Sequence, residues 1–303
     1  MFNTENRVQL SSFGSLFDRL LLDATFFSVA KISSRVDAKL VPLTALKYLD
    51  ELEANISRIA GVLCTPEISS SVPKGIGCAV TSEPVAAAFR IHKALSERPN
   101  YYWTDFDTQI PSTAQVHPSA FVAARNVVIG EHSVIGPHAA IYERSAIGSN
   151  CHIGASTVIG CEAFEVPLID GRKQLHPQAG GVRIAGQVVI CSNSSVAKSS
   201  FPAFTEIGEG CMLDNHVHVA HDCVLEPGCT VTHGSLLAGR VHLEKGVYVG
   251  PNTSISNGVK IGRNSTVSIG STVVKDVREK TRVTGNFAIE HGQFIRNLKR
   301  SVE

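Results

Sequence analysis

The densest group of potentially reactive side chains is the run NHVHVAHD at positions 215–222, which contains His216, His218 and His221. A neutral histidine, with a pKa near 6.5, accepts a proton near neutral pH, as attack of an amine on a thioester requires. A His-x-His pair followed by a third histidine is also typical of zinc ligands. A solvated polar face without a chemical role gives the same pattern. The run therefore leaves three interpretations open: a general base at His221, a metal site, or an inert surface.

The elements that position this run repeat every six residues. A six-residue period in branched aliphatic side chains fits neither an α-helix nor a simple alternating strand. It predicts hexads that each form a short strand and a turn, with three hexads closing one coil of a parallel β-helix. The first run of the period comprises Ile129, Ile135, Ile141, Ile147, Ile153 and Ile159, it resumes at Ile184, Ile190 and Val196, and the second run extends from Ile207 through Val219, Leu237 and Ile255 to Val273.

The position two residues before each aliphatic also points inward and must be small. Four cysteines occupy it, so we expect them to be packing residues rather than redox or metal-binding groups: Cys151, Cys211, Cys223 and Cys229. A buried thiol has a raised pKa and no access to substrate. Cys223 is therefore not expected to act as a nucleophile beside His221, and with Val219 facing inward we expect His216 and His218 to face outward by strand alternation.

One coil of 18 residues stacks Gly239 on His221. A glycine there lets a substrate approach the main chain, and its amide is placed to hold the oxyanion of a tetrahedral intermediate, although an ordinary turn glycine fits equally well. The period is interrupted at 161–181 and again at 197–206. Loops that leave a rigid solenoid often carry binding residues, so we expect these interruptions to contribute to the site.

Outside the solenoid the pattern changes. Short apolar runs at 59–63 and 76–80 and a helical stretch at 85–95 predict a small α/β domain over 1–110, followed by the β-helix over 111–275 and a C-terminal cap or helix over 276–303. A net charge of +1 argues against a nucleic-acid-binding surface. The polar start of the chain and the lack of an apolar stretch of ~18 residues lead us to expect a cytoplasmic protein without a membrane span.

The chain as a whole resembles the bacterial UDP-3-O-acylglucosamine N-acyltransferases of lipid A synthesis. The resemblance rests on LDN at 213–215 leading into VAH at 219–221, LAG at 237–239, VIG at 158–160 with Phe164, and KYLDEL at 47–52. It implies a homotrimer with a left-handed parallel β-helix, active sites between subunits, and acyl transfer from acyl carrier protein to the amine of a nucleotide sugar. It also implies that His221 is the general base, that the Gly239 amide binds the oxyanion, and that Tyr48 stacks on the uracil.

The C-terminal half is also similar to sugar N-acetyltransferases that use acetyl-CoA, at 221–223, 257–262 and 271–286. We therefore expect no tightly bound cofactor, and acyl carrier protein or CoA as the carrier of the acyl group. The predicted substrate-binding residues are Tyr48, Phe164, Asp214, Asn215, His216 and His218, and the predicted donor-binding residues are Asn257, Gly258, Gly285 and Asn286.

The sequence thus predicts an N-acyltransferase that acts on a nucleotide-linked amino sugar. One alternative is an acyl-CoA-dependent enzyme of surface polysaccharide synthesis. A second is a zinc-dependent hydratase on the same solenoid, with His216, His218 or His221 as ligands across a trimer interface. A third is a homologue that only binds a nucleotide sugar, since Pro42 and Gly258 replace an aromatic residue and a second histidine of the family.

Overall fold

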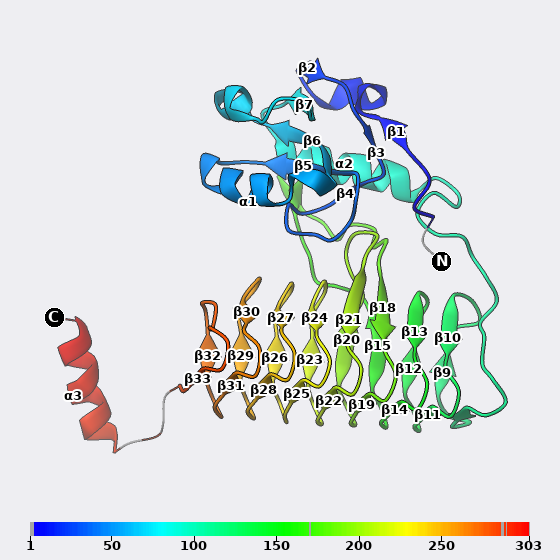
Figure 1. Ribbon diagram of the computed structural model, residues 1–303, viewed down its shortest axis with the longest axis vertical. Coiled ribbons are helices and arrows are strands. Elements are labelled where there is room, and N and C mark those ends of the chain that lie inside the picture. The colour runs from blue at the N-terminus through cyan, green and yellow to red at the C-terminus, as the bar shows by residue number, and fades with distance from the viewer. Residues whose placement is uncertain (1–2, 170, 286–287, 289, 303) are drawn as a thin grey trace.

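The computed structural model describes residues 3–169, 171–285, 288 and 290–302. Its larger part is a parallel β-helix with three flat faces, because three successive hexads lay one short strand on each face. Figure 1 shows its axis running across the lower half of the molecule, with the N-terminal domain above its middle.

Each face is one sheet of stacked parallel strands. Face 1 contains β10 (Val127–Ile129), β13 (Ser145–Ile147), β18 (Gly181–Ile184), β21 (Phe204–Ile207), β24 (Val224–Leu225), β27 (His242–Leu243) and β30 (Lys260–Ile261). Face 2 contains β8 (Gln115–Val116), β11 (Val134–Ile135), β14 (His152–Ile153), β19 (Val189–Ile190), β22 (Met212–Leu213), β25 (Thr230–Val231), β28 (Tyr248–Val249), β31 (Thr266–Val267) and β33 (Arg282–Val283). Face 3 contains β9 (Phe121–Val122), β12 (Ala140–Ile141), β15 (Val158–Cys161), β20 (Ser195–Ala197), β23 (His218–Val219), β26 (Leu236–Leu237), β29 (Ser254–Ile255) and β32 (Thr272–Val273).

The aliphatic residues of the six-residue period fill the inside of the β-helix, as predicted. Val196, Val219 and Leu237 stack on one another from coil to coil and are fully buried. The four cysteines of the small inward position are buried among them, and burial raises the pKa of Cys223 to about 12. The thiol of Cys223 is thus a packing group with no reactive thiolate.

The β-helix ends later than the hexads predict. It continues past 275, because β33 pairs with β31, joining Thr266 to Arg282. The last coil departs from the six-residue spacing, which is why periodicity alone missed it. The C-terminal helix α3 (His291–Val302) extends away from this end in Figure 1 instead of covering it.

The N-terminal domain is built on a five-stranded sheet in the order β2 (Arg19–Leu22), β7 (Gly77–Val80), β6 (Ile59–Cys64), β5 (Lys39–Leu43) and β4 (Ser28–Val29). The small helix α1 (Leu49–Ala54) follows β5, and β1 (Val8–Gln9) pairs antiparallel with β3 (Thr25–Phe26) at the start of the chain. Short 3₁₀ helices span Leu10–Leu16, Leu46–Tyr48, Ile56–Arg58 and Pro66–Ser71.

The helix α2 (Pro84–Ser96) covers the sheet and joins the two domains. It begins at Pro84, where the missing N–H costs no hydrogen bond, and buries Phe89 and Leu95. Its buried side chains share one hydrophobic cluster with Ala179 and Phe201, which belong to the two interruptions of the β-helix. The interruptions therefore anchor the N-terminal domain. Among the described residues no helix is long and apolar enough to span a membrane.

Candidate active site

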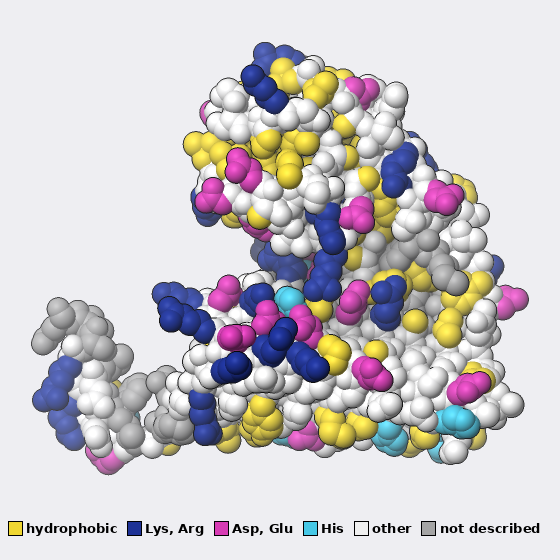
Figure 2. Space-filling model, viewed as in Figure 1, with side chains coloured by type: hydrophobic (Ala, Val, Ile, Leu, Met, Phe, Trp, Pro, Cys, Tyr) yellow, Lys and Arg dark blue, Asp and Glu magenta, His cyan; other side chains and the backbone are white. Residues whose placement is uncertain are grey.

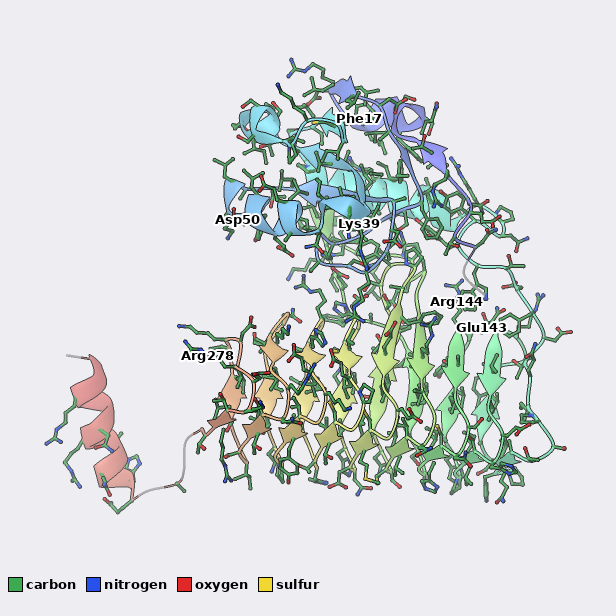
Figure 3. The ribbon with its side chains drawn as sticks, in the orientation of Figure 1. Phe17, Lys39, Asp50, Glu143, Arg144 and Arg278 are labelled. Carbon is green, nitrogen blue, oxygen red and sulfur yellow. The ribbon has the colours of Figure 1, made fainter. Side chains whose placement is uncertain are left out.

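Both interruptions leave the β-helix at the same corner, where the chain turns from face 3 to face 1. We call this the insertion corner; it comprises residues 142–144, 162–180, 198–203, 220–223, 238–241 and 256–259, between the strands already named. Figure 3 places Glu143 and Arg144 along this upper edge of the β-helix, below the N-terminal domain. His221 belongs to the same corner. Hexad stacking thus brings residues far apart in sequence into one column.

His221 is held by a carboxylate. Its Nδ1 lies 2.7 Å from Oδ2 of Asp222, and its side chain is 12% exposed. Because a carboxylate only accepts, Nδ1 carries the hydrogen and the neutral ring presents a basic Nε2. Asp222 is fixed in turn: its other oxygen accepts a short hydrogen bond from the Ser199 hydroxyl, and its backbone N–H donates to Thr205 Oγ1 at 2.9 Å. The arrangement is that of an oriented general base.

Gly239 lies directly against the basic nitrogen. A Cβ atom at this position would lie 2.6 Å from His221 Nε2 and 3.0 Å from Asn257 Oδ1. Arg240 donates its backbone N–H to the His221 carbonyl at 2.8 Å, as coil stacking requires. Within the part of the chain that the structure describes, the Gly239 N–H has no hydrogen-bond partner. An unused N–H beside a base is the group that an oxyanion needs.

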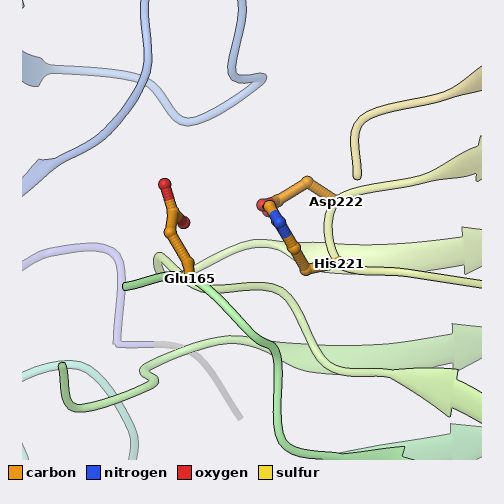
Figure 4. Close-up of side chains that lie close together, drawn as sticks. All are labelled: Glu165, His221 and Asp222. Atoms are coloured by element: carbon orange, nitrogen blue, oxygen red, sulfur yellow. The ribbon is translucent and has the colours of Figure 1, made fainter. Parts of the chain in front are cut away.

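The insertion loop, residues 162–180 between β15 and β18, adds a second carboxylate to this site. Atoms of Glu165, His221 and Asp222 lie within 4.8 Å of one another (Figure 4). Lys31, from the N-terminal domain, places its Nζ 2.6 Å from Glu165 Oε1. Burial acts to raise the pKa of Glu165, but the His176 imidazole and the Lys31 ammonium outweigh it and hold this pKa well below the usual range. Glu165 is therefore ionised beside the His221–Asp222 pair.

A cavity of about 930 Å³ opens between the two domains. Asp222 and Arg240 line it from the insertion corner, Lys260 lines it from face 1, and Arg35 lines it from the N-terminal domain. Figure 2 shows charged side chains of both signs around this hollow. Its N-terminal wall is fixed by Lys39, labelled in Figure 3, whose buried ammonium donates to the Ser34 carbonyl at 2.6 Å. The volume suits a ligand of nucleotide-sugar size.

Two of the predicted donor-binding residues lie at the insertion corner. Asn257 reaches Gly239, and Gly258 lines the cavity with a backbone φ of 73°. Gly285 lies beyond β33, where its N–H donates to Ser271 Oγ at 2.8 Å. Asn286 lies outside the described residues.

Three predicted substrate-binding residues lie at a different corner, between faces 2 and 3. Asp214 accepts the N–H of Asn215 at 2.7 Å, Asn215 Oδ1 accepts the N–H of Ser192 at 3.1 Å, and His216 packs edge-on against His233. His216 is exposed, as expected, but its placement on a strand is wrong, because it occupies the turn before β23 with φ 59°. Within one chain, these residues do not join His221.

His218 lies on face 3, where its Nδ1 is 2.7 Å from Ser195 Oγ. Burial and the nearby His221 lower its pKa, so it is neutral near pH 7. Among the described residues, His216, His218 and His221 of one chain do not bring their nitrogens together as a set of ligands. A zinc site of these three histidines is therefore not assembled within one chain.

The two predicted aromatic contacts are exposed. Phe164 is 88% exposed on the insertion loop, next to Glu165. Tyr48 is 37% exposed at the end of its 3₁₀ helix, with the Lys47 ammonium 5.0 Å from its ring centre. Both rings are accessible for stacking.

Sequence reasoning missed three members of the site: Ser199, Glu165 and Lys31. Ser199 and Glu165 fall in the two interruptions of the six-residue period. Counting hexads alone places both interruptions at the same corner as His221. Lys31 carries no signal in the sequence, because its position depends on how the N-terminal domain docks. Asp222 ends the histidine-rich run at 215–222, and its place next to His221 in the sequence is the signal that identifies it as a partner of the ring.

Comparison with known proteins identifies the repeats. A family model described as bacterial transferase hexapeptide (six repeats) matches residues 126–161 and 204–239. Over 206 residues the chain is 37% identical to a protein named UDP-3-O-acylglucosamine N-acyltransferase 2 from Nitrobacter winogradskyi. This match covers 58% of this chain and 59% of that protein. Over 65 residues it is 43% identical to UDP-3-O-acylglucosamine N-acyltransferase 3 from Gloeobacter violaceus, covering 21% and 19% of the two chains.

The chain therefore spans less than two thirds of these relatives. The solved UDP-N-acetylglucosamine acyltransferase from Campylobacter jejuni matches with a TM-score of 0.51 and 21% identity, over 65% of this chain and 81% of that chain. This likeness confirms the fold, a left-handed parallel β-helix. The chain thus contains hexapeptide repeats of the kind that this family model describes, over residues 126–161 and 204–239.

Proposed function

We propose that this protein is an N-acyltransferase that moves an acyl group from a thioester to the amine of a nucleotide-linked amino sugar. The observation that carries the proposal is the oriented His221, whose Nδ1 is held by Asp222 and whose Nε2 faces Gly239. The interdomain cavity of about 930 Å³ beside it supports a large acceptor. The names of the relatives support a UDP-linked glucosamine that bears a 3-O-acyl chain as the acceptor, and a place in lipid A synthesis.

The geometry supports a mechanism without a covalent enzyme intermediate. The amine nitrogen attacks the thioester carbonyl while His221 Nε2 takes one of its protons. The carbonyl oxygen becomes an oxyanion, which accepts a hydrogen bond from the Gly239 N–H. Collapse of the intermediate breaks the C–S bond, and the departing thiolate takes the proton from Nε2. Asp222 stabilises the imidazolium in between, while Ser199 holds Asp222.

The carrier of the acyl group is acyl carrier protein or CoA in this proposal, with Asn257 and Gly258 nearest to the thioester. A homotrimer is proposed as the working form. Its support is a set of exposed apolar side chains at outward positions of faces 2 and 3: Met212 (52% exposed), Leu236 (43%) and Tyr248 (42%). Exposed apolar side chains on adjoining faces favour burial against other subunits.

The test combines binding and turnover. Purified protein is incubated with UDP-, GDP- or dTDP-linked amino sugars and with acetyl-CoA or an acyl carrier protein thioester, and the N-acylated product is measured by mass spectrometry. We expect turnover with a UDP-glucosamine derivative and a loss of roughly 10²–10⁴ in kcat for His221→Ala. The control is His132→Ala, which changes an exposed histidine at another corner.

Three results would contradict the proposal. Near-normal turnover of His221→Ala would show that His221 is not the general base. A rise in melting temperature with a nucleotide sugar, but no product with any thioester, would indicate a protein that only binds the sugar. Stoichiometric zinc in the purified protein, with activity lost on chelation, would favour the hydratase.

A further inference from the structure

Glu165 joins three segments of the chain at one point. It belongs to the insertion loop, it pairs with Lys31 of the N-terminal domain, and it faces His221 and Asp222 of the insertion corner (Figure 4). Only 15% of its side chain is exposed, so its charge is weakly screened by water. Its charge therefore acts on its neighbours strongly.

His176 lies on the buried side of this cluster. Its side chain is 2% exposed, and its Nε2 lies 3.7 Å from Glu165 Oε2, too far for a hydrogen bond. Its Nδ1 lies 2.8 Å from the Pro177 carbonyl, which only accepts, so Nδ1 carries a hydrogen. Its Nε2 is therefore the nitrogen that faces the Glu165 carboxylate.

Basic side chains therefore lie on both sides of the Glu165 carboxylate. Lys31 and His176 lie on one side of the Glu165 carboxylate, and the His221–Asp222 pair lies on the other. Nearby, His218 is neutral, and Arg240 follows Gly239 in the next coil. The charge of Glu165 thus favours a positive His221, while Lys31 opposes that effect.

We propose that Glu165 is a positioning residue that stabilises the imidazolium form of His221, and that Lys31 limits this effect and so couples the strength of the base to docking of the N-terminal domain. This inference deepens the proposed function, because it assumes that His221 is the base. The electrostatic coupling itself can be measured whether or not the reaction is acyl transfer.

The expected size follows from the separation. Removing one unit charge at 4.8 Å changes the pH midpoint of a titration by about 0.6 unit at the dielectric constant of water, and by more in a partly buried site. Glu165→Gln removes the negative charge, so the His221 midpoint falls. Lys31→Met leaves Glu165 without its partner, so the His221 midpoint rises. Both variants break the same ion pair, so a purely structural role predicts the same direction for both.

The experiment follows the His221 ring in the full chain by NMR with ¹³C-labelled histidine, assigned by loss of its signal in His221→Gln. The acid limb of the kcat/KM profile against pH is measured alongside. We expect shifts in opposite directions for Glu165→Gln and Lys31→Met. Glu162→Gln and Lys74→Met, which change exposed charges on the same loop and in the same domain, are expected to leave the midpoint in place.

Shifts in the same direction, or no shift in folded variants, would overturn the proposal. If Glu165→Gln does not fold, Glu165→Asp keeps the charge and is expected to keep the wild-type midpoint, while Lys31→Met still tests the sign. Opposite shifts without any acyl transfer would leave this inference standing and refute the proposed function. Acyl transfer with an unchanged His221 midpoint in these variants would support the proposed function and refute this inference.

Discussion

Replacing Gly239 by alanine tests the geometry of the site most directly. The added Cβ would lie 2.6 Å from Nε2 and 2.7 Å from Cε1 of His221, whereas ordinary contacts begin near 3.4 Å. The imidazole must therefore move by about 0.8 Å, the difference between 3.4 and 2.6 Å. Because Nδ1 is tied to Asp222 at 2.7 Å, this movement weakens that hydrogen bond or tilts Nε2 away from the substrate.

The cost falls on catalysis rather than on stability. A misplacement of about 1 Å in a catalytic group costs about 10²-fold in rate, which corresponds to about 2.7 kcal/mol of transition-state stabilisation. The imidazole is a side chain at the surface of the β-helix, so the free energy of unfolding is expected to change by no more than about 1 kcal/mol.

The assay is kcat/KM for N-acylation, together with the melting temperature of Gly239→Ala. The matched control is Gly186→Ala, another corner glycine, whose Cβ would meet only the Ser149 carbonyl at 3.3 Å. We expect the control to keep wild-type activity. Gly239→Ala with activity within fivefold of wild type, in protein where His221→Ala is inactive, would refute the argument that Gly239 makes room for the base.

Three further predictions test other parts of the molecule. Ser199→Ala removes a hydrogen bond to the Asp222 carboxylate and is expected to lower kcat about tenfold with little change in KM, measured by steady-state kinetics. Leu236→Glu places a charge on the exposed apolar surface of face 3 and is expected to lower the solution mass measured by light scattering. Burial lowers the pKa of His92 from 6.5 to about 4, so the unfolded chain binds a proton that the folded chain does not. The free energy of unfolding should therefore fall by up to about 3 kcal/mol as the pH falls from 6.5 to 4, and denaturant titrations of His92→Gln should lack this slope.

The β-helix could be predicted from sequence because its rule is local. Every hexad places one aliphatic residue inside and one turn residue outside, so the stacking of Gly239 on His221 follows from counting 18 residues. The same count separates Asp214 and Asn215 from His221, since they precede β23 and His221 follows it. Asp214 and Asn215 were grouped with His221 because they are close to it in sequence. In a β-helix, residues a few positions apart can lie at different corners.

What sequence could not predict depends on contacts between distant segments. The insertion loop is fixed by packing against α2, where the ring centres of His92 and His176 lie 5.5 Å apart. Both rings donate a hydrogen bond to the Pro177 carbonyl. Neither the six-residue period nor a motif describes such a junction. The orientation of Glu165 and its pairing with Lys31 follow from that packing.

The rigid column of the β-helix fixes His221, Asp222 and Gly239 relative to one another. The His221 and Gly239 carbonyls accept backbone N–H groups of the next coil, and the Asp222 N–H donates to Thr205 Oγ1. The groups that adjust the charge around His221, Glu165 and Lys31, come instead from a loop and a second domain. The reactive groups are therefore placed by the repeat, and their electrostatic environment depends on the docking of a domain that the repeat does not specify.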